Sequence, residues 1–507
     1  MKDIMVLQNK RYYVLTLLVV LLLSATSCKK WFDLKPSNGI IDEDYWKTKE
    51  DVHAATIGCY ASLLGDPANK DKQLAEILFL WGELRADMLA SAVNTRSEEF
   101  EVMNMNTSPS NIITDWRPVY RSINYCNILL KKGPAVMELD KTFTQDMLNS
   151  YLAEAKALRA LLYFYLVRSF GEVPLKLEPT TSDDELVALA KSTQQQVLQQ
   201  IVADLQDAEA KAALTYGSQA SDKGRITRYT INAIQADVYL WMERYTDAIA
   251  ACNKIITSRK FGLIAGNAAW FNTLYYTGNS NESLFEFQFS RQKMNSFHAM
   301  FATTKRFVAA TVVMDQVYTT DNSSALTRDV RADGAAVRAA DNTIWKYVGK
   351  NAEDLRSSDE SYAHWFVYRY ADVLLMKAEA LAQLHTTEAA TEALDLIYTV
   401  RQRANALTAT DNAPSTTDFD GVARFVLEEQ AREQMYEGKR WYNLLRFAKR
   451  DNYAHLDVLL DLVATTVPLN MMNSARAKIR DYNSHYFPIF QYELQTNKNL
   501  VQNPFYK

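Results

Sequence analysis

The chain has 507 residues but only 15 Gly and 11 Pro, well below average usage, which is roughly 12% for the two together. Because both residues mark turns, their scarcity argues against a many-stranded β-sandwich or barrel and against a glycine-rich nucleotide-binding fold. Apolar residues make up 48% of the chain, and the net charge of −4 gives no basic excess for binding nucleic acid. The class that remains is a large, mainly α-helical globular protein.

Residues 1–27 have the pattern of a bacterial lipoprotein signal peptide. Three basic residues precede an apolar stretch at 14–23, which is too short to span roughly 30 Å of hydrocarbon but suits a signal peptide. Small residues at 24–27 lead to Cys28, an arrangement that resembles a lipobox. The resemblance implies cleavage before Cys28 and lipidation of its thiol, which would anchor the mature chain to a membrane. No later stretch is apolar for long enough to predict a membrane-spanning helix.

The other three cysteines, Cys59, Cys126 and Cys252, each lie in an apolar helical context. Their number is odd, and no CxxC motif occurs, so we expect small buried thiols rather than a disulfide framework or a zinc site.

Amphipathic spacing predicts a series of helices in the first half of the chain. The expected ranges are 49–64, 74–87, 116–130, 145–169 and 192–213. Between the second and third of these, residues 88–113 are polar and lack periodicity, so they are predicted to form a long irregular loop. Loops of that length are usually functional or disordered.

Two stretches, 230–257 and 371–403, predict pairs of helices with small alanines where the helices would cross. An aromatic residue near each turn makes the pairs resemble tetratricopeptide units, although no strict 34-residue repeat is present. The intervening residues 261–350 predict an irregular, loop-rich part with short extended runs at 284–289 and 343–348.

Several motifs that carry chemistry are absent. The chain has no phosphate-binding GxxxxGK[ST] or GxGxxG loop, no HExxH and no GxSxG, and its six histidines lack metal-ligand spacing. We therefore expect no cofactor, no metal and no enzymatic activity. A glycosidase stays open as an alternative, because two carboxylates can meet in space without any sequence signal.

An ordered set of short strings resembles the SusD/RagB family of nutrient-binding outer-membrane lipoproteins of Bacteroidetes. The strings span the whole chain in the order typical of that family. They are DLKP at 33–36, DYWKT at 44–48, GELRAD at 82–87, YRYADVLL at 368–375, EGKRW at 437–441, FPI at 487–489 and QNP at 502–504.

The resemblance implies a mainly α-helical SusD-like fold with embedded tetratricopeptide-like pairs. Its N-terminal region would be 28–260 and its C-terminal region 261–507, packed as one globular unit. It also implies a non-enzymatic glycan-binding protein, anchored in the outer membrane and facing the cell surface, that delivers ligand to a SusC-like TonB-dependent transporter. A peptide-binding RagB-like protein and a tetratricopeptide scaffold that binds only proteins stay open. Lys29 and Lys30 follow Cys28, where surface-exported relatives often carry acidic residues, so a periplasmic orientation also stays open.

Charged residues of the strongest strings are predicted to form structural ion pairs rather than a reactive site, because their spacing places them on helix faces. This interpretation covers Arg369, Asp372, Glu379, Glu428, Glu429, Arg432, Glu433, Glu437 and Arg440.

Sugar recognition requires exposed aromatic rings for the C–H faces of a pyranose, together with amide or charged groups for its hydroxyls. Two stretches offer that combination, and ligand sites of the family often draw on them. The candidates are Asn94, Arg96, Phe100, Asn104 and Asn106 in the first stretch, and Phe289, Arg291, Asn295, Phe297, His298, Phe301 and Phe307 in the second.

Overall fold

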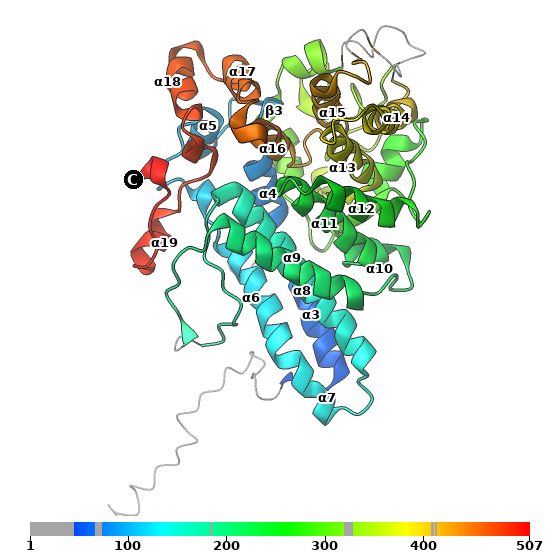
Figure 1. The fold of residues 1–507 in the computed structure, drawn as a ribbon, viewed down its shortest axis with the longest axis vertical. Coiled ribbons are helices and arrows are strands. Elements are labelled where there is room, and N and C mark those ends of the chain that lie inside the picture. Colours follow the sequence, from blue (N-terminus) through cyan, green and yellow to red (C-terminus); the bar gives the residue numbers. More distant parts are fainter. Residues whose placement is uncertain (1–44, 66–72, 183–184, 319–327, 407–409, 411–412) are drawn as a thin grey trace, which may run out of the picture. The chain divides into compact units, whose positions relative to one another are not determined.

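Helices dominate the chain between Thr48 and Lys507 in the computed structural model (Figure 1). The structure describes residues 45–65, 73–182, 185–318, 328–406, 410 and 413–507. The predicted signal peptide and Cys28 lie outside these residues. Within them the mainly α-helical class is confirmed, and no helix in these ranges is both long and apolar enough to cross a bilayer.

The helices predicted before residue 213 are confirmed, and four of them lie against one another (Figure 1). Thr48 begins the first with a capping box to Asp51, and Gly171, at a φ of 76°, follows the end of the third. Cys59 and Cys126 are buried free thiols in this layer. The four helices are α3 (Lys49–Leu63), α6 (Arg117–Lys132), α8 (Gln145–Phe170) and α9 (Gln194–Lys211).

Both predicted helix pairs are also present, and they extend this layer into a continuous row. The connections within each pair are three or four residues long, so the paired helices run antiparallel. Helix α9 contacts the first pair. The two pairs also contact each other, although one belongs to the predicted region 28–260 and the other to 261–507. The pairs are α11 (Arg228–Trp241) with α12 (Tyr245–Ile256), and α13 (Tyr370–Ala382) with α14 (Thr387–Arg403).

Within the described part of the chain, six short strands form three antiparallel ladders in the segments that join the helices. Both predicted extended runs contain a strand, and β6 lies directly before α13, where no strand was predicted. The ladders are β1 (Leu89–Ser91) with β3 (Phe307–Ala309), β2 (Ser283–Phe287) with β6 (Trp365–Arg369), and β4 (Val337–Arg338) with β5 (Thr343–Ile344).

The prediction of an irregular loop over 88–113 is wrong in part. The segment contains β1 and also the helix α5 (Ser97–Met103). A hydrogen bond caps the start of this helix, since Glu99 Oε2 accepts the N–H of Arg96, the residue before the helix, at 2.9 Å. The Glu99 side chain is buried. Polar composition thus concealed a helix whose polar side chains serve as caps and anchors.

Further helices complete the structure, most of them near the C-terminus, where no helix ranges were predicted. The short ones are α7 (Val136–Leu139), α10 (Gln219–Gly224) and α19 (Gln491–Thr496). The longer ones are α4 (Leu74–Glu83), α15 (Phe419–Glu433), α16 (Arg440–Tyr453), α17 (Asp457–Thr466) and α18 (Leu469–Ile479).

The end of α4 is held against the start of α16, which joins two of the strings that resemble the SusD/RagB family. Glu83 Oε1 accepts the N–H groups of Gly438 at 2.7 Å and Lys439 at 3.2 Å. Asp87 accepts two hydrogen bonds from the Arg440 guanidinium, at 2.9 and 2.8 Å. Burial raises the pKa of Glu83 to about 8. These contacts fix the chain segment that leads from α4 into β1.

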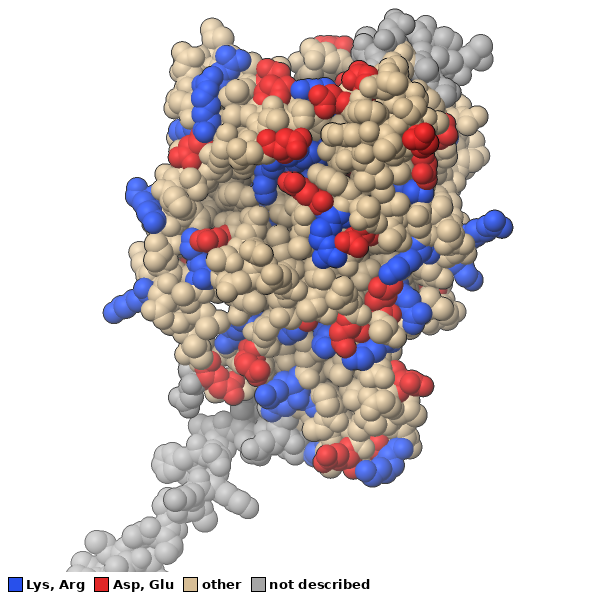
Figure 2. All heavy atoms as spheres, in the orientation of Figure 1, with Lys and Arg blue, Asp and Glu red and all other residues tan. Residues whose placement is uncertain are grey.

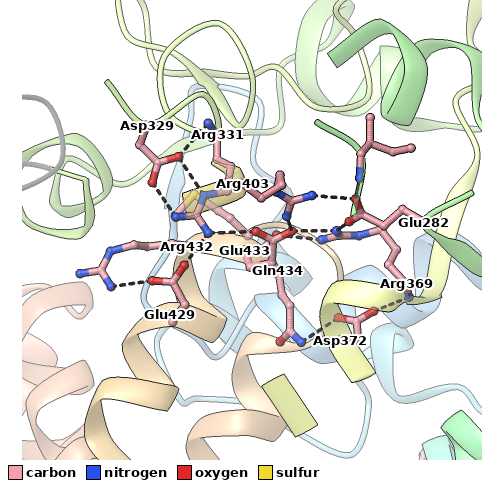
Figure 3. A network of polar contacts seen from close by, with 12 residues as sticks. Glu282, Asp329, Arg331, Arg369, Asp372, Arg403, Glu429, Arg432, Glu433 and Gln434 are labelled. Atoms are coloured by element: carbon pink, nitrogen blue, oxygen red, sulfur yellow. Dashed lines mark hydrogen bonds and ion pairs between the residues drawn. The ribbon is translucent and has the colours of Figure 1, made fainter. Parts of the chain in front are cut away.

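A buried network of ion pairs joins the residue before β2, the end of β6, α14 and α15 (Figure 3). Arg369 is at its centre and is fully buried. Its guanidinium lies 2.7 Å from Glu282 and 2.8 Å from both Glu433 and Glu437. Arg403 bridges the first two of these carboxylates from α14. The predicted role in structural ion pairs is therefore confirmed for Arg369, Glu433 and Glu437.

This network predicts that the protein is sensitive to acid. Burial opposes ionisation of Glu437 and Glu429, but the surrounding Arg and Lys side chains outweigh it and lower both pKa values to about 2. Each group therefore stabilises the fold fully above its unfolded pKa near 4.5, by roughly 3 kcal/mol, and loses that contribution as pH falls toward 2. We expect the thermal unfolding temperature to drop steeply below about pH 4.5. An unfolding temperature that stays constant down to about pH 3 would contradict this.

Candidate functional site

A cleft of about 280 Å³ opens where α5, β1 and β3 meet the turn between α17 and α18. Figure 1 shows α5, β3, α17 and α18 in the same part of the molecule. One wall comes from α5 and another from β3 and the residues after it. Thr465, Thr466 and Pro468 close the third side. The cleft therefore combines segments that are more than 300 residues apart in the chain.

The apolar part of the cleft is centred on Phe100, whose side chain projects from α5. Phe100 is 41% exposed, more than any other phenylalanine among the described residues. Met103, Leu89, Val308 and Val312 line the cleft with it. An exposed aromatic ring beside smaller apolar groups provides the kind of surface on which the C–H face of a sugar can lie.

The polar part of the lining consists of uncharged groups with one exception. Asn342 lies directly before β5, and its carbonyl accepts the N–H of Ala309 at 2.8 Å. The hydroxyls of Thr465 and Thr466 donate to the Leu462 carbonyl at 3.0 and 2.9 Å, which leaves their oxygens able to accept. These groups can exchange hydrogen bonds with ligand hydroxyls.

The exception is Asp87, the one carboxylate among the described lining residues. Both of its oxygens are already bonded to Arg440. A glycosidase needs two carboxyl groups facing each other across a cleft, and this lining supplies one that is committed elsewhere. Among the described residues no cluster of three His, Cys, Asp or Glu side chains could hold a metal ion.

A buried cation fixes the wall formed by α5. Arg306, directly before β3, is ion-paired with Glu76 of α4 at 3.0 Å and with Glu99 of α5. Thr95 donates to the Arg306 carbonyl at 2.6 Å. The two stretches that were predicted to bind sugar therefore meet where Arg306 contacts Thr95 and Glu99. This contact holds Phe100 in place.

The first predicted group lies in or beside the cleft. Phe100 and Asn104 line it, although Asn104 is buried and its amide donates to the Phe100 carbonyl at 2.7 Å. Asn94 and Arg96 are exposed on the loop before α5, and the Asn94 amide donates to Thr304 at 2.6 Å. Asn106 accepts from Lys478 of α18 at 2.7 Å.

The prediction of an exposed aromatic platform is wrong for the second group. Phe289, Phe297, Phe301 and Phe307 are at most 3% exposed. The Phe297 ring lies 4.5 Å from that of Tyr347. These rings form core because the segment folds inward onto α4, which places them out of reach of a ligand at the surface.

The polar members of the second group are also occupied within the protein. Asn295 and His298 are buried, and they bond to the carbonyls of Ala363 at 2.7 Å and Arg356 at 2.9 Å. Arg291 is exposed and lies 3.7 Å from Asp359. None of these three lines the cleft, so no contact in the structure links them to Phe100.

Asn342 and residues from the stretch 465–468 line the cleft but were not predicted from the sequence. Neither stretch has aromatic enrichment or unusual polarity, and both reach the cleft only through long-range packing. Only the tertiary structure shows that these residues lie beside the cleft.

Comparison with known proteins agrees with this fold. A family model described as "SusD family" matches residues 238–506, and one described as "Starch-binding associating with outer membrane" matches residues 30–240. The chain is 27% identical to SusD-like protein P38 of Formosa agariphila over 483 residues, which covers 86% of this chain and 91% of that protein.

Solved structures show the same architecture. A SusD superfamily protein of Bacteroides vulgatus gives a TM-score of 0.71 at 21% identity, over 91% of this chain and 100% of that one. Another, from Bacteroides thetaiotaomicron, gives 0.70 at 21% identity, over 91% and 99%. Because the SusD family model matches more than half of the sequence, and the strings expected of that family occur in order, the chain belongs to the SusD family.

Proposed function

We propose that this protein captures a glycan in the cleft beside α5 and delivers it to a SusC-like TonB-dependent transporter in the outer membrane. The exposed Phe100 ring, in a lining whose polar groups are uncharged apart from Asp87, carries the proposal. The family description of the N-terminal match, starch binding in association with the outer membrane, supports it. Capture would be non-enzymatic, and the transporter would supply the energy-coupled step.

The charge distribution supports a ligand that is not strongly charged at this site. Figure 2 shows basic and acidic side chains interspersed over the face seen in Figure 1, without a broad patch of either sign. A binding surface for nucleic acid would concentrate Lys and Arg on one face. The glycan hydroxyls would instead bond to neutral groups such as Asn342.

Anchoring belongs to the same proposal and rests on the sequence. The signal-like segment 1–27 and the following Cys28 would place acyl chains on the N-terminus of the mature protein. We propose that the protein faces the cell surface, where it would meet polysaccharide. Protease treatment of intact cells would test this orientation.

Replacing Phe100 by alanine should weaken glycan binding about tenfold, because truncating a central aromatic contact typically costs 1–2 kcal/mol or so. The whole chain, solubilised in detergent, is first run in affinity gels against a panel of polysaccharides, and calorimetry then measures binding of the best one. Tyr125→Ala is the matched control, since Tyr125 on α6 is 45% exposed and does not line the cleft.

Equal loss of affinity in both variants would contradict a site at Phe100. Failure of every glycan to retard the protein would contradict glycan capture itself. Binding of oligopeptides instead, lost on Phe100→Ala, would identify the protein as a peptide-uptake lipoprotein.

A further inference from the structure

A second cavity, of about 640 Å³, opens beside α10 and shares no lining residue with the cleft at Phe100. Its walls come from the loop before α10, from α10 itself, from the start of α11 and from residues 260–261. Its volume lies within the range of roughly 300–1,000 Å³ that ligand pockets occupy. Binding in this cavity would therefore be separate from binding in the α5 cleft.

Lys223 of α10 lines this cavity and is only 6% exposed. Among the described residues its ammonium forms no hydrogen bond or ion pair, and it lies 4.4 Å from the ring centroid of Phe261. Arg225, two residues later, is paired with Glu154 at 2.6 Å. Burying an unpaired cation costs free energy that one aromatic face offsets only in part. A buried ammonium without an ion-pair partner at the wall of a cavity is suited to binding an anionic ligand.

The nearby carboxylates are already engaged. Asp222 accepts from the Thr215 hydroxyl at 2.8 Å and from the Tyr216 N–H at 2.5 Å. Glu286 lies 2.6 Å from the ring of His364 and accepts the N–H of Asn279. Neither is within ion-pair distance of Lys223. Lys260 adds a second, exposed cation to the lining.

The rest of the lining suits a sugar ring rather than a simple ion. The rings of Tyr229 and Phe261 meet edge to face, with centroids 5.3 Å apart, and both line the cavity. The Asn281 amide, also in the lining, has no hydrogen-bond partner among the described residues. Aromatic rings beside a free amide match the C–H face and hydroxyls of a pyranose.

We propose that this cavity binds a sugar acid, with the carboxylate of a hexuronate held by Lys223 and its ring lying against Tyr229 and Phe261. The site would give the protein a second specificity, for the acidic units of a polysaccharide, independent of the cleft at Phe100.

Calorimetry on the whole chain in detergent tests this with sodium digalacturonate and with the same disaccharide as its neutral methyl ester. The acid should bind at least tenfold more tightly than the ester. Lys223→Met should lower its affinity at least tenfold, and Lys141→Met, which removes an exposed charge between α7 and α8, should leave it unchanged. The Lys223→Met protein should unfold at the same or a higher temperature, because it no longer buries an unpaired cation.

A pH series on the unaltered protein keeps the test decisive if the variant does not fold. Burial lowers the Lys223 pKa to about 8, against the opposing charges of Glu286 and Asp222. Affinity for the acid should therefore be constant near neutral pH and fall as pH rises above about 8. Affinity for the methyl ester should not change.

Four results would each overturn the proposal. They are equal binding of acid and ester, absence of binding at millimolar concentration, sodium acetate binding as tightly as the disaccharide, and a glutamyl dipeptide binding more tightly than it. The first two would leave the result for Phe100→Ala untouched.

Discussion

Gly82→Ala is expected to destabilise the protein by about 3 kcal/mol or more, at the upper end of what overpacking costs. A Cβ atom at this position would lie 1.9 Å from the Gly438 carbonyl oxygen and 2.3 Å from its carbon. Both are backbone atoms, so no side chain can turn aside. Gly438 has a φ of 71° and is itself close to Trp365 and to the Leu78 carbonyl, so its backbone has little room to retreat.

Gly58→Ala is the matched control, because a Cβ atom there meets nothing within 4 Å. Gly58 lies inside α3, where alanine should stabilise the fold by roughly 0.5–1 kcal/mol. In denaturant unfolding, the free energy of unfolding should fall for Gly82→Ala and rise for Gly58→Ala if the α4–α16 contact is as close as described. Similar midpoints for the two variants would contradict that close approach.

Much of the helical framework could be predicted from the sequence because its signals are local. The helix that begins after Thr48 and the one that ends before Gly171 each carry a cap at the boundary, and their apolar faces have the right period. Helix α5 was missed because Glu99, which reads as a solvent-exposed charge, is buried against Arg306. That pairing depends on a residue more than 200 positions away.

The candidate cleft could be predicted only in part, for a related reason. Sequence identifies Phe100 and Phe297 equally well as aromatic residues in polar surroundings. Tertiary packing then buries one completely and leaves the other 41% exposed. Asn342 and Thr465 reach the cleft through packing of segments that are distant in the chain, and no local pattern reports that.

The strings that identify the family say more about the fold than about the ligand. Residues 82–87 and 437–441 hold α4 against α16, and Arg369 and Asp372 belong to the buried polar network. Phe100, Asn342 and Thr465 belong to none of these strings. Membership in the SusD family therefore fixes the scaffold. The shared string at 82–87 contributes Leu84, Ala86 and Asp87 to the lining of the candidate cleft, and the rest of the lining lies outside the shared strings.

Arg369→Met should lower the free energy of unfolding by about 3–5 kcal/mol, because it leaves buried carboxylates without their central cation. Methionine keeps much of the volume, so the loss is mainly electrostatic. Glu282, Glu433 and Glu437 would then rely on Arg331, Arg403, Lys346 and Lys439. The change is measured by denaturant unfolding near neutral pH. Arg291→Met is the control, because the Arg291–Asp359 pair is 68% exposed on both sides and spans 3.7 Å. Exposed pairs contribute less than about 1 kcal/mol.

The pH dependence of this loss separates charge from packing. Burial opposes ionisation of Glu433 and Glu437, and Arg369 is among the cations that keep their pKa values low. Without it these pKa values rise, so the carboxylates take up protons at higher pH and the penalty shrinks as pH falls from neutral toward about 5. The difference in the free energy of unfolding between Arg369→Met and the unaltered protein should therefore become smaller over that range. A gap that stays constant with pH would mean that Arg369 acts through its packing, and the network of Figure 3 would then have no electrostatic role in holding the helices together.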